Sequence, residues 1–336
     1  MVHEQKNSIR WGVLGAGKFA REQMTPAIHM AHNAVFSAIA TSDATKAQAF
    51  QAFQPGLRVF TDYDALLADP DIDAVYVPLP NHLHVEWTLK ALAAGKAVLT
   101  EKPIGLEDAD FDRLIEARNS SGLLAAEAYM PVHHPQWQRI RDLIDADEIG
   151  ALSHVRGMFC YNNSADTDNI RNRPETAGGA LRDIGVYPFG MVRFATAQEP
   201  SLVSANITWE NGVDTTSRVS ASFANFSFEA VVSMRMHEFQ EMSFHGDRGV
   251  LHLAAPFNPL KYAEAVVTMT TGAQTRSWRF PSVNQYVLQV ENFGAAMRGE
   301  MTYPVSLEFS RGTQRMIDLA FASAGVPGGN APVDHA

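Results

Sequence analysis

Cysteine is almost absent from this chain, because Cys160 is the only one among its 336 residues. A single thiol cannot form an internal disulfide or a zinc site built from thiolates, and it fits a reducing compartment. No apolar run approaches the roughly 20 consecutive residues that a membrane-spanning helix needs. The first ten residues are polar, and they lack both a hydrophobic signal core and a twin-arginine pair. We therefore expect a cytoplasmic protein that does not bind membranes.

Positive charge is also scarce. The chain has 27 Lys and Arg against 37 Asp and Glu, which gives a formal net charge of −10. A nucleic-acid surface needs a basic face, so this class of partner is excluded. Two pairs of nearby histidines, His82 with His84 and His133 with His134, have no carboxylate at ligand spacing. We expect no metal site, and a small molecule as the partner.

Two kinds of periodicity divide the chain, whose length favours two domains. In residues 8–130, short apolar runs alternate with helical patterns, which predicts a doubly wound parallel sheet. Strands are expected at Ile9–Leu14, Ala34–Thr41, Ala74–Pro78, Ala97–Thr100 and Leu123–Ala126, and helices at Lys18–Ala31, Ala44–Phe53, Tyr63–Ala68, His84–Ala94 and Leu106–Ser120.

After about residue 150 the strands follow one another, with turn residues between them, which predicts an antiparallel sheet. These strands are expected at Ala151–Tyr161, Leu202–Trp209, Ser217–Phe223, Ser227–Met236, Glu241–Gly246, Gly249–Ala254, Ala263–Thr270 and Gln274–Phe280. Helices are expected at Pro135–Ala146, Gly178–Ala195, Val283–Arg298 and Ser306–Ala324.

The first strand ends in a glycine turn, Gly15-Ala16-Gly17-Lys18-Phe19-Ala20. In such a turn Gly15 permits the tight bend, Gly17 lets the backbone approach a pyrophosphate, and the following helix offers its amides. An ordinary strand-to-helix turn is the alternative. The position between a first strand and a helix favours dinucleotide binding, with Gly15, Gly17, Lys18 and Phe19 as contacts.

The end of the second strand distinguishes the two nicotinamide cofactors. Thr41, Ser42 and Lys46 suit a ribose 2′-phosphate, whereas an NAD site expects an acidic residue there. Asp43 could fill that role, but we interpret it as the N-cap of the next helix. We therefore predict NADP as the cofactor, and NAD remains possible.

A lysine follows another strand, in Thr100-Glu101-Lys102-Pro103. Residues at the carboxyl ends of parallel strands line the crevice where such sheets bind ligands. We expect Lys102 and Glu101 there, together with Leu79, Asn81 and His84 at the end of the neighbouring strand.

These segments together resemble the Gfo/Idh/MocA oxidoreductase family, named after glucose-fructose oxidoreductase and inositol dehydrogenase. The resemblance covers essentially the whole chain and is carried by the glycine turn, 78–84, Glu101-Lys102-Pro103, 127–130, His134-Pro135, 178–187, 284–286 and 291–293. It implies an α/β protein with an N-terminal Rossmann domain and a C-terminal domain whose large, mostly antiparallel open sheet forms a homodimer or homotetramer. It also implies hydride transfer between NAD(P) and a sugar or polyol without a metal, and a cis bond before Pro103. We place the NAD(P)-binding domain at 1–127, the substrate-binding and oligomerisation domain at 128–330 and a loose tail at 331–336.

The pattern Asp183-Ile184-Gly185-Val186-Tyr187 resembles the branch of glucose-fructose oxidoreductase, dihydrodiol dehydrogenases and D-xylose 1-dehydrogenases. In a helix Asp183 and Tyr187 share a face. Free tyrosine and lysine have pKa values of about 10, so a nearby Lys102 ammonium would be needed to favour the phenolate. We expect Tyr187 as the base, Lys102 as its charge partner and Asp183 to orient the substrate or Lys102. The alternative is that Tyr187 only packs.

Other residues concern the substrate. Many relatives have an arginine where this chain has Val132, which favours a neutral sugar over an acidic or phosphorylated one. His134, Tyr161 and Tyr286 are candidate sugar contacts. The polar loop 169–174 is either a solvated connection or a flap whose arginines contact cofactor or sugar.

We predict an NADP-dependent dehydrogenase that oxidises the C1 hydroxyl of a neutral aldose such as D-xylose to a lactone. A trans-dihydrodiol dehydrogenase and an aldose–aldose oxidoreductase are the enzyme alternatives. A non-catalytic NAD(P)-binding sensor is the third, and the presence of both Lys102 and Tyr187 disfavours it.

Overall fold

The computed structural model describes residues 8–329, which form two compact units. The first contains residues up to 105, 109–133 and 284–308, and the second contains 106–108, 134–283 and the residues from 309 onward. The sequence predicts a boundary between residues 127 and 128, whereas the first unit runs on to residue 133 and regains a late segment. The reason is that α8 (Gln285–Met297) packs against helix α1 of this unit.

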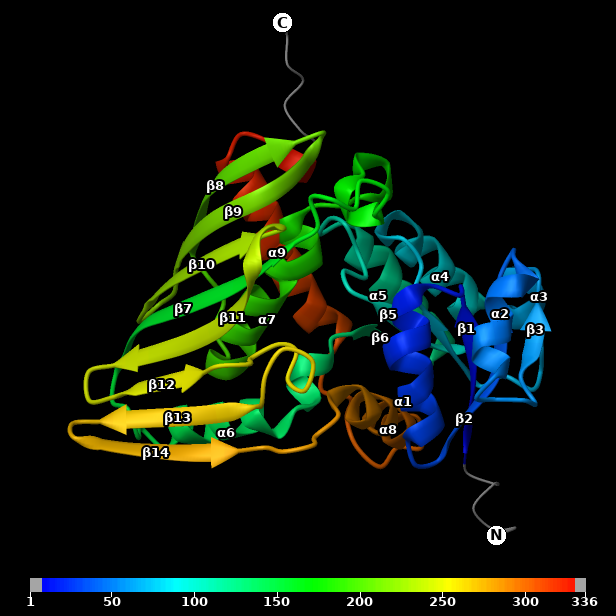
Figure 1. The fold of residues 1–336 in the computed structure, drawn as a ribbon, viewed down its shortest axis with the longest axis horizontal. Coiled ribbons are helices and arrows are strands. Elements are labelled where there is room, and N and C mark those ends of the chain that lie inside the picture. Colours follow the sequence, from blue (N-terminus) through cyan, green and yellow to red (C-terminus); the bar gives the residue numbers. More distant parts are fainter. Residues whose placement is uncertain (1–7, 330–336) are drawn as a thin grey trace, which may run out of the picture. The chain divides into compact units, whose positions relative to one another are not determined.

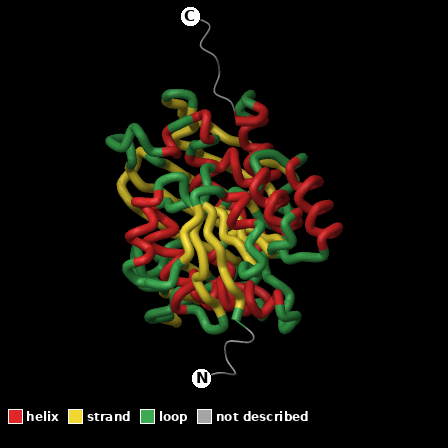
Figure 2. The backbone as a smooth tube through the Cα atoms, turned by 90° about the vertical axis from the view of Figure 1, so that its right-hand side faces the viewer, coloured by secondary structure: helices red, strands yellow, loops and turns green. Residues whose placement is uncertain are grey.

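The first unit is built on a six-stranded sheet. Figure 1 labels strands of this sheet, and Figure 2 draws strands in yellow and helices in red. The order is β3-β2-β1-β4-β5-β6, every pair is parallel, and the predicted Rossmann fold is confirmed. The strands are β1 (Ile9–Leu14), β2 (Ala34–Ala40), β3 (Arg58–Phe60), β4 (Ala74–Val77), β5 (Ala97–Glu101) and β6 (Ala125–Ala128).

Helices cover both faces of this sheet. Trp11 on one face packs against Phe293 of α8, while the next residue, Gly12, faces Leu66 on the other. The helices of the unit, besides α8, are η2 (Ala20–Met24), α1 (Thr25–Met30), α2 (Ala44–Gln51), α3 (Tyr63–Leu67), η3 (Asn81–Leu83), α4 (His84–Ala93), α5 (Asp110–Ser121) and η4 (Met130–His133).

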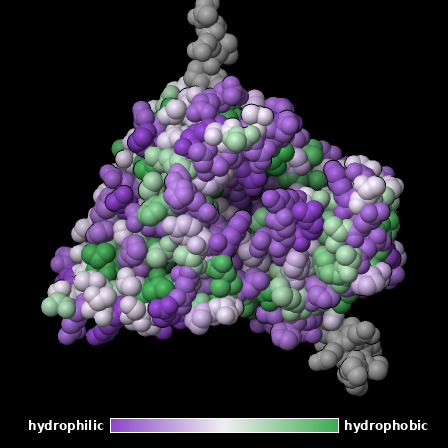
Figure 3. Space-filling view, viewed as in Figure 1, coloured by the Kyte–Doolittle hydropathy of each residue, from purple (hydrophilic) through white to green (hydrophobic). Residues whose placement is uncertain are grey.

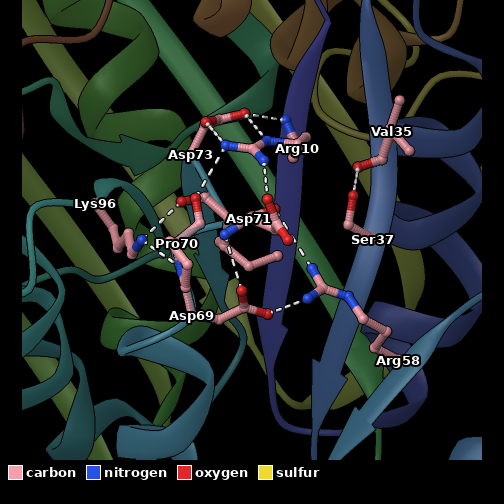
Figure 4. A network of polar contacts seen from close by, with 10 residues as sticks. Arg10, Val35, Ser37, Arg58, Asp69, Pro70, Asp71, Asp73 and Lys96 are labelled. Atoms are coloured by element: carbon pink, nitrogen blue, oxygen red, sulfur yellow. Dashed lines mark hydrogen bonds and ion pairs between the residues drawn. The ribbon is translucent and has the colours of Figure 1, made fainter.

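An ionic network ties the loop between α3 and β4 to the start of β1 (Figure 4). Arg10 donates to Asp73 at 2.8 Å, Arg58 pairs with Asp69, and Lys96 donates to the Asp69 carbonyl at 2.7 Å. Because β1 and β4 run parallel, this network lies at the amino-terminal edge of the sheet and leaves the carboxyl ends free for a ligand.

The second unit is built on an eight-stranded sheet of order β14-β13-β12-β11-β7-β10-β9-β8. Only β7 and β10 pair in parallel, so the sheet is mostly antiparallel, as predicted. The strands are β7 (Leu152–Asn162), β8 (Leu202–Glu210), β9 (Val213–Ser222), β10 (Ser227–Ser233), β11 (Arg235–Gly246), β12 (Val250–Leu253), β13 (Val266–Thr271) and β14 (Gln274–Arg279).

Helices α6 (Pro135–Asp145), α7 (Val186–Thr196) and α9 (Leu307–Ser323) line one face of this sheet (Figure 1). That face is apolar, with Val155 and Phe228 buried, whereas Arg156 and Glu229 on the other face are exposed. Short helices η5 (Ile170–Asn172), η6 (Pro174–Thr176) and η7 (Leu181–Gly185) lie between β7 and α7, and η8 (Pro327–Gly329) follows α9.

Hydrophilic residues predominate on the face of the molecule drawn in Figure 3. Across residues 8–329, no helix has both the length and the apolar character needed to cross a membrane.

Candidate functional site

The turn after β1 has the room that a pyrophosphate needs. Gly15 adopts φ +110°, and a Cβ at this position would press on Leu79. A Cβ on Gly17 would meet only the Pro78 carbonyl oxygen at 4.0 Å, so the backbone is open to a ligand there. The helix that follows starts at Lys18, and its first amides have no partner within the helix. These residues therefore fit the phosphates of an NAD(P) cofactor.

The end of β2 matches the interpretation made from the sequence. The carboxylate of Asp43 accepts the Thr45 amide at 3.0 Å and caps α2, and these hydrogen bonds lower the pKa of Asp43. This confirms its role as an N-cap. Ser42 and Lys46 are exposed beside buried Thr41. A hydroxyl and an ammonium thus remain at the strand end for a phosphate.

His84 joins the ends of two strands. Its Nδ1 lies 2.7 Å from the Pro103 carbonyl oxygen, and its Nε2 lies 2.7 Å from that of Leu79. Burial lowers the pKa of His84 to about 4. His84 is thus held between the backbone at Leu79 and at Pro103, and its part in cofactor binding stays a prediction. Asn81 opens the short helix η3 beside them.

Lys102 directly follows β5, and its bond to Pro103 is cis, as the family resemblance implies. The preceding carboxylate, Glu101, accepts the Tyr76 hydroxyl at 2.6 Å and the Lys102 amide at 3.2 Å. Burial raises the pKa of Glu101, against the lowering effect of Tyr76 and Lys102. Glu127 accepts the amide of the next residue, Ile104, at 2.9 Å, so carboxylates hold the backbone on both sides of the Lys102–Pro103 bond.

Tyr286, predicted from the sequence as a sugar contact, lies in the first unit. Its ring packs edge-on against Phe19 of the glycine turn, with the centroids 5.7 Å apart. Burial and the charge of Glu101 raise the pKa of Tyr286. Tyr286 thus lies beside Phe19, one of the residues predicted to hold the cofactor, and its role as a sugar contact stays a prediction.

In the second unit, Asp183 and Tyr187 stand on one continuous helix. Asp183 lies in the π-helix η7 and Tyr187 in the first turn of α7, and both are buried. The ring of Tyr187 packs against Phe159 and Phe257, with centroid distances of 5.3 and 5.6 Å. The wider π turns occur often at functional sites. They fix where this phenol and this carboxylate project.

Asp183 is held by two partners. The Arg171 guanidinium pairs with it at 2.9 Å, and the Tyr161 hydroxyl donates to it at 2.6 Å. The charge of Asp183 raises the pKa of Arg171, and burial together with Asp183 raises the pKa of Tyr161. The Asp183 carboxylate therefore faces a cation and a hydroxyl donor, and Tyr161 and Asp183 act as one polar group.

The loop 169–174 is an ordered anchor rather than a bare connection. Arg171 enters the Asp183 ion pair, and Arg173 pairs instead with exposed Asp168 at 2.9 Å. The sequence left two alternatives for these arginines, a solvated connection or a flap in which they contact cofactor or sugar. The pairing of Arg171 with Asp183 was missed because nothing in the local pattern links the two residues.

His134 has a structural place. It is fully buried, its Nδ1 accepts the Gln136 amide at 3.2 Å as the N-cap of α6, and its ring meets Phe280 edge-on. Burial lowers the pKa of His134 to about 4. Its contacts thus include Gln136 of α6 and Phe280, and its role as a sugar contact stays a prediction. Within residues 8–329, no group of three or more His, Cys, Asp or Glu side chains is arranged to hold a metal ion.

Two family descriptions match the chain. An oxidoreductase family with an NAD-binding Rossmann fold, GFO_IDH_MocA, matches residues 9–129. The GFO/IDH/MocA C-terminal domain matches residues 137–252. The glycine turn and Lys102 fall in the first match, and Asp183 with Tyr187 in the second.

Several characterised or named proteins are similar over nearly their full length. The uncharacterized oxidoreductase ORF334 of Rhizobium meliloti is 37% identical, over 94% of this chain and 97% of its own. A dTDP-3,4-didehydro-2,6-dideoxy-alpha-D-glucose 3-reductase of Streptomyces violaceoruber is 33% identical, over 88% and 87%. A D-xylose 1-dehydrogenase (NADP(+)) of Haloferax volcanii is 30% identical, over 94% and 97%.

A solved structure extends the likeness to three dimensions. The 3-ketoreductase of Actinomadura kijaniata, in complex with NADP and TDP-benzene, has a TM-score of 0.86 at 28% identity and covers 94% of this chain and 98% of its own.

Proposed function

The chain belongs to the Gfo/Idh/MocA oxidoreductase family, and on this premise we propose that it is an NADP-dependent dehydrogenase acting on C1 of a neutral aldose. It is a sugar oxidoreductase that acts on CH–OH groups and has an NAD(P)-binding Rossmann domain. The finer proposal is oxidation of the anomeric hydroxyl of a sugar such as D-xylose, which gives the lactone. The observation that carries it is the Asp183 carboxylate, which pairs with Arg171 and lies one helical turn before Tyr187.

The preference for NADP rests on the end of β2. Asp43 is engaged with Thr45 and α2, so it is not the acceptor that a free ribose would require. Lys46 and Ser42 supply a cation and a hydroxyl for a 2′-phosphate. The NADP-dependent xylose dehydrogenase and the NADP-bound ketoreductase support the same choice.

The bound cofactor supplies the hydride acceptor at its nicotinamide. Tyr187 takes the proton from the reacting hydroxyl, and the Lys102 ammonium stabilises the alkoxide charge that develops on the sugar. Asp183, paired with Arg171, accepts a hydrogen bond from the sugar and orients it. The negative charge of a Tyr187 phenolate interacts favourably with Arg171, so this guanidinium also favours the base form.

A neutral sugar is favoured by the charges around Asp183. Arg171 pairs with Asp183, and Arg235 pairs with Glu210 at 2.7 Å. A phosphate group needs cations that are free to form charge-assisted hydrogen bonds, and these two are already compensated. Val132, in place of an arginine, points the same way.

A second candidate is reduction of the 3-keto group of a nucleotide-linked deoxysugar. The 33% identical 3-reductase from Streptomyces violaceoruber favours it. In this reverse direction Tyr187 would donate a proton to the reduced carbonyl oxygen. The Lys102 ammonium would stabilise the negative charge that develops on that oxygen.

One substrate panel decides between the two. We expect NADP reduction with aldoses, at a kcat/KM at least tenfold above that with NAD, and little oxidation of NADPH with a dTDP-linked 3-keto sugar. Polyols and trans-dihydrodiols complete the panel. Turnover confined to the keto sugar would replace the first proposal by the second, and no turnover with any compound would favour the sensor.

The base is tested by Tyr187→Phe. General acid–base groups contribute about 10² to 10⁴ in rate, so we expect a kcat lower by at least 100-fold with little change in the KM for NADP. Tyr303→Phe, which also removes a buried hydroxyl hydrogen bond, is the matched control. Near-normal turnover of the Tyr187 variant would refute the assignment.

A further inference from the structure

One buried carboxyl group of the second unit has no part in the mechanism above. Asp214 on β9 is 1% exposed, and its Oδ2 accepts the backbone amide of Leu181 at 2.7 Å. Ser217 on the same strand adds a longer hydrogen bond at 3.4 Å. Because Leu181 is the first residue of η7, this carboxyl group caps the helix that carries Asp183 and Tyr187.

The chain just before the helix is shaped around this carboxyl group. Gly179 has φ +113°, and a Cβ there would overlap Oδ1 of Asp214. A Cβ on Gly178 would overlap the backbone carbonyl of Arg171, which accepts the Gly179 amide at 3.0 Å. The two glycines therefore let β9 and the Arg171 loop approach the same helix start.

This cap differs from an ordinary turn contact because the Asp214 carboxyl group can ionise. Burial raises the pKa of Asp214 to about 7, while the Leu181 amide and the charge of Arg182 lower it. A buried carboxyl group costs free energy unless its partners compensate for desolvation. Here the compensation comes from the helix start itself, where amides and the helix dipole favour an acceptor.

We propose that Asp214 is a positioning residue, whose carboxyl group fixes the first turn of η7 and thereby the placement of Asp183 and Tyr187. The proposal rests on the dehydrogenase function proposed above. Asp214 is 1% exposed, so its carboxyl group is closed off from solvent. It acts through the Leu181 amide, two residues before Asp183 and six before Tyr187.

Three variants test the kinetic part. Asp214→Ala removes the acceptor, and we expect kcat to fall at least tenfold with the KM for NADP within twofold of the wild type. Asp214→Asn keeps an oxygen that can accept the Leu181 amide, so we expect it to retain kcat within threefold. The control is Thr215→Val on the neighbouring position of β9, which loses a buried hydroxyl bonded to the Thr208 carbonyl and should keep its kcat.

Hydrogen exchange without substrate tests the structural part separately. Exchange of the amides in residues 180–187, measured by mass spectrometry, should rise at least tenfold in Asp214→Ala and stay unchanged in Thr215→Val. An alanine variant with wild-type kcat and wild-type exchange overturns the proposal. If that variant does not fold, Asp214→Asn decides, because loss of kcat there would also overturn it. A wild-type protein without turnover whose exchange still responds to Asp214→Ala would sink the dehydrogenase function and leave the helix cap standing.

Discussion

At the scale of single residues, the arginines near Asp183 are paired with carboxylates of the protein. Arg171 is 39% exposed at its side chain, yet its charge is directed at Asp183, which is 10% exposed. Breaking an ion pair with one buried partner costs much more free energy of folding than breaking a surface pair. The reason is that the remaining charge is left where water solvates it poorly. The arrangement predicts that neighbouring arginines of one loop have unequal importance.

Arg171→Met should therefore lower kcat about tenfold and reduce stability, because the Asp183 carboxylate would lose the guanidinium that pairs with it at 2.9 Å. Arg173→Met breaks an exposed pair with Asp168. It should change kcat by less than twofold and lower the stability less than Arg171→Met does. Steady-state kinetics and thermal unfolding of both variants measure this. Equal losses in the two would contradict the role given to Arg171.

The raised pKa of Asp214 predicts a dependence of stability on pH. Between its ordinary value of 3.8 and about 7, the folded protein holds a proton that the unfolded chain has released, so stability falls as pH rises through this interval. Each pH unit corresponds to about 1.4 kcal/mol.

Urea unfolding of the wild type and Asp214→Asn between pH 5 and 8 measures the effect. The free energy of unfolding of the wild type should decline relative to the variant up to about pH 7 and run parallel to it above. Parallel curves throughout would mean that Asp214 is ionised in the folded protein at pH 5.

At the scale of elements, patterns that are long or local were predictable and contacts between distant segments were not. β1 has the predicted bounds, whereas β3 (Arg58–Phe60) was missed because three residues carry no detectable period. β6 begins at Ala125, two residues later than expected, and α5 begins at Asp110 rather than at Leu106.

The same distinction applies to the site. The glycine turn and Lys102 can be predicted from a few consecutive residues and from their position after a strand. The contact between Asp214 and Leu181 joins residues 33 apart in the sequence. The ion pair between Arg171 and Asp183 joins η5 to η7. Only the fold brings these groups together, so no spacing in the sequence reveals them.

The start of η7 gives a prediction at this scale. Gly179→Ala should destabilise the protein by about 3 kcal/mol or more, since its φ of +113° is unfavourable for alanine and the new Cβ would overlap Asp214. Gly272→Ala has φ +58° and no atom within 4 Å of the new Cβ, so its cost should be about 1 kcal/mol. Chemical unfolding compares the two, and equal costs would show that the overlap is relieved without strain.

At the scale of the whole molecule, the family resemblance implies self-association through the second sheet, and we propose the face opposite its helices as the surface. Val231 of β10 pairs in register with Met158 of β7, and both side chains are partly exposed beside charged Arg156 and Glu229. A symmetric dimer uses the same patch on both copies, so a single change acts twice.

We expect the wild type to have twice or four times the monomer mass in multi-angle light scattering. Val231→Arg should shift it toward the monomer, whereas Leu319→Arg, on an exposed position of α9, should leave the mass unchanged. A monomeric wild type would contradict the use of this face.

The return of residues 284–308 to the first unit has a consequence for synthesis on the ribosome. Trp11 is fully buried and one of its partners is Phe293, so this contact cannot form until nearly the entire chain has been translated. A nascent or truncated chain that ends near residue 133 would present the apolar surface that Phe293 covers to solvent and to chaperones. The first unit, although it is encoded first, therefore cannot be completed before residues 284–308 have been made, only shortly before the residues from 309 onward that complete the second unit.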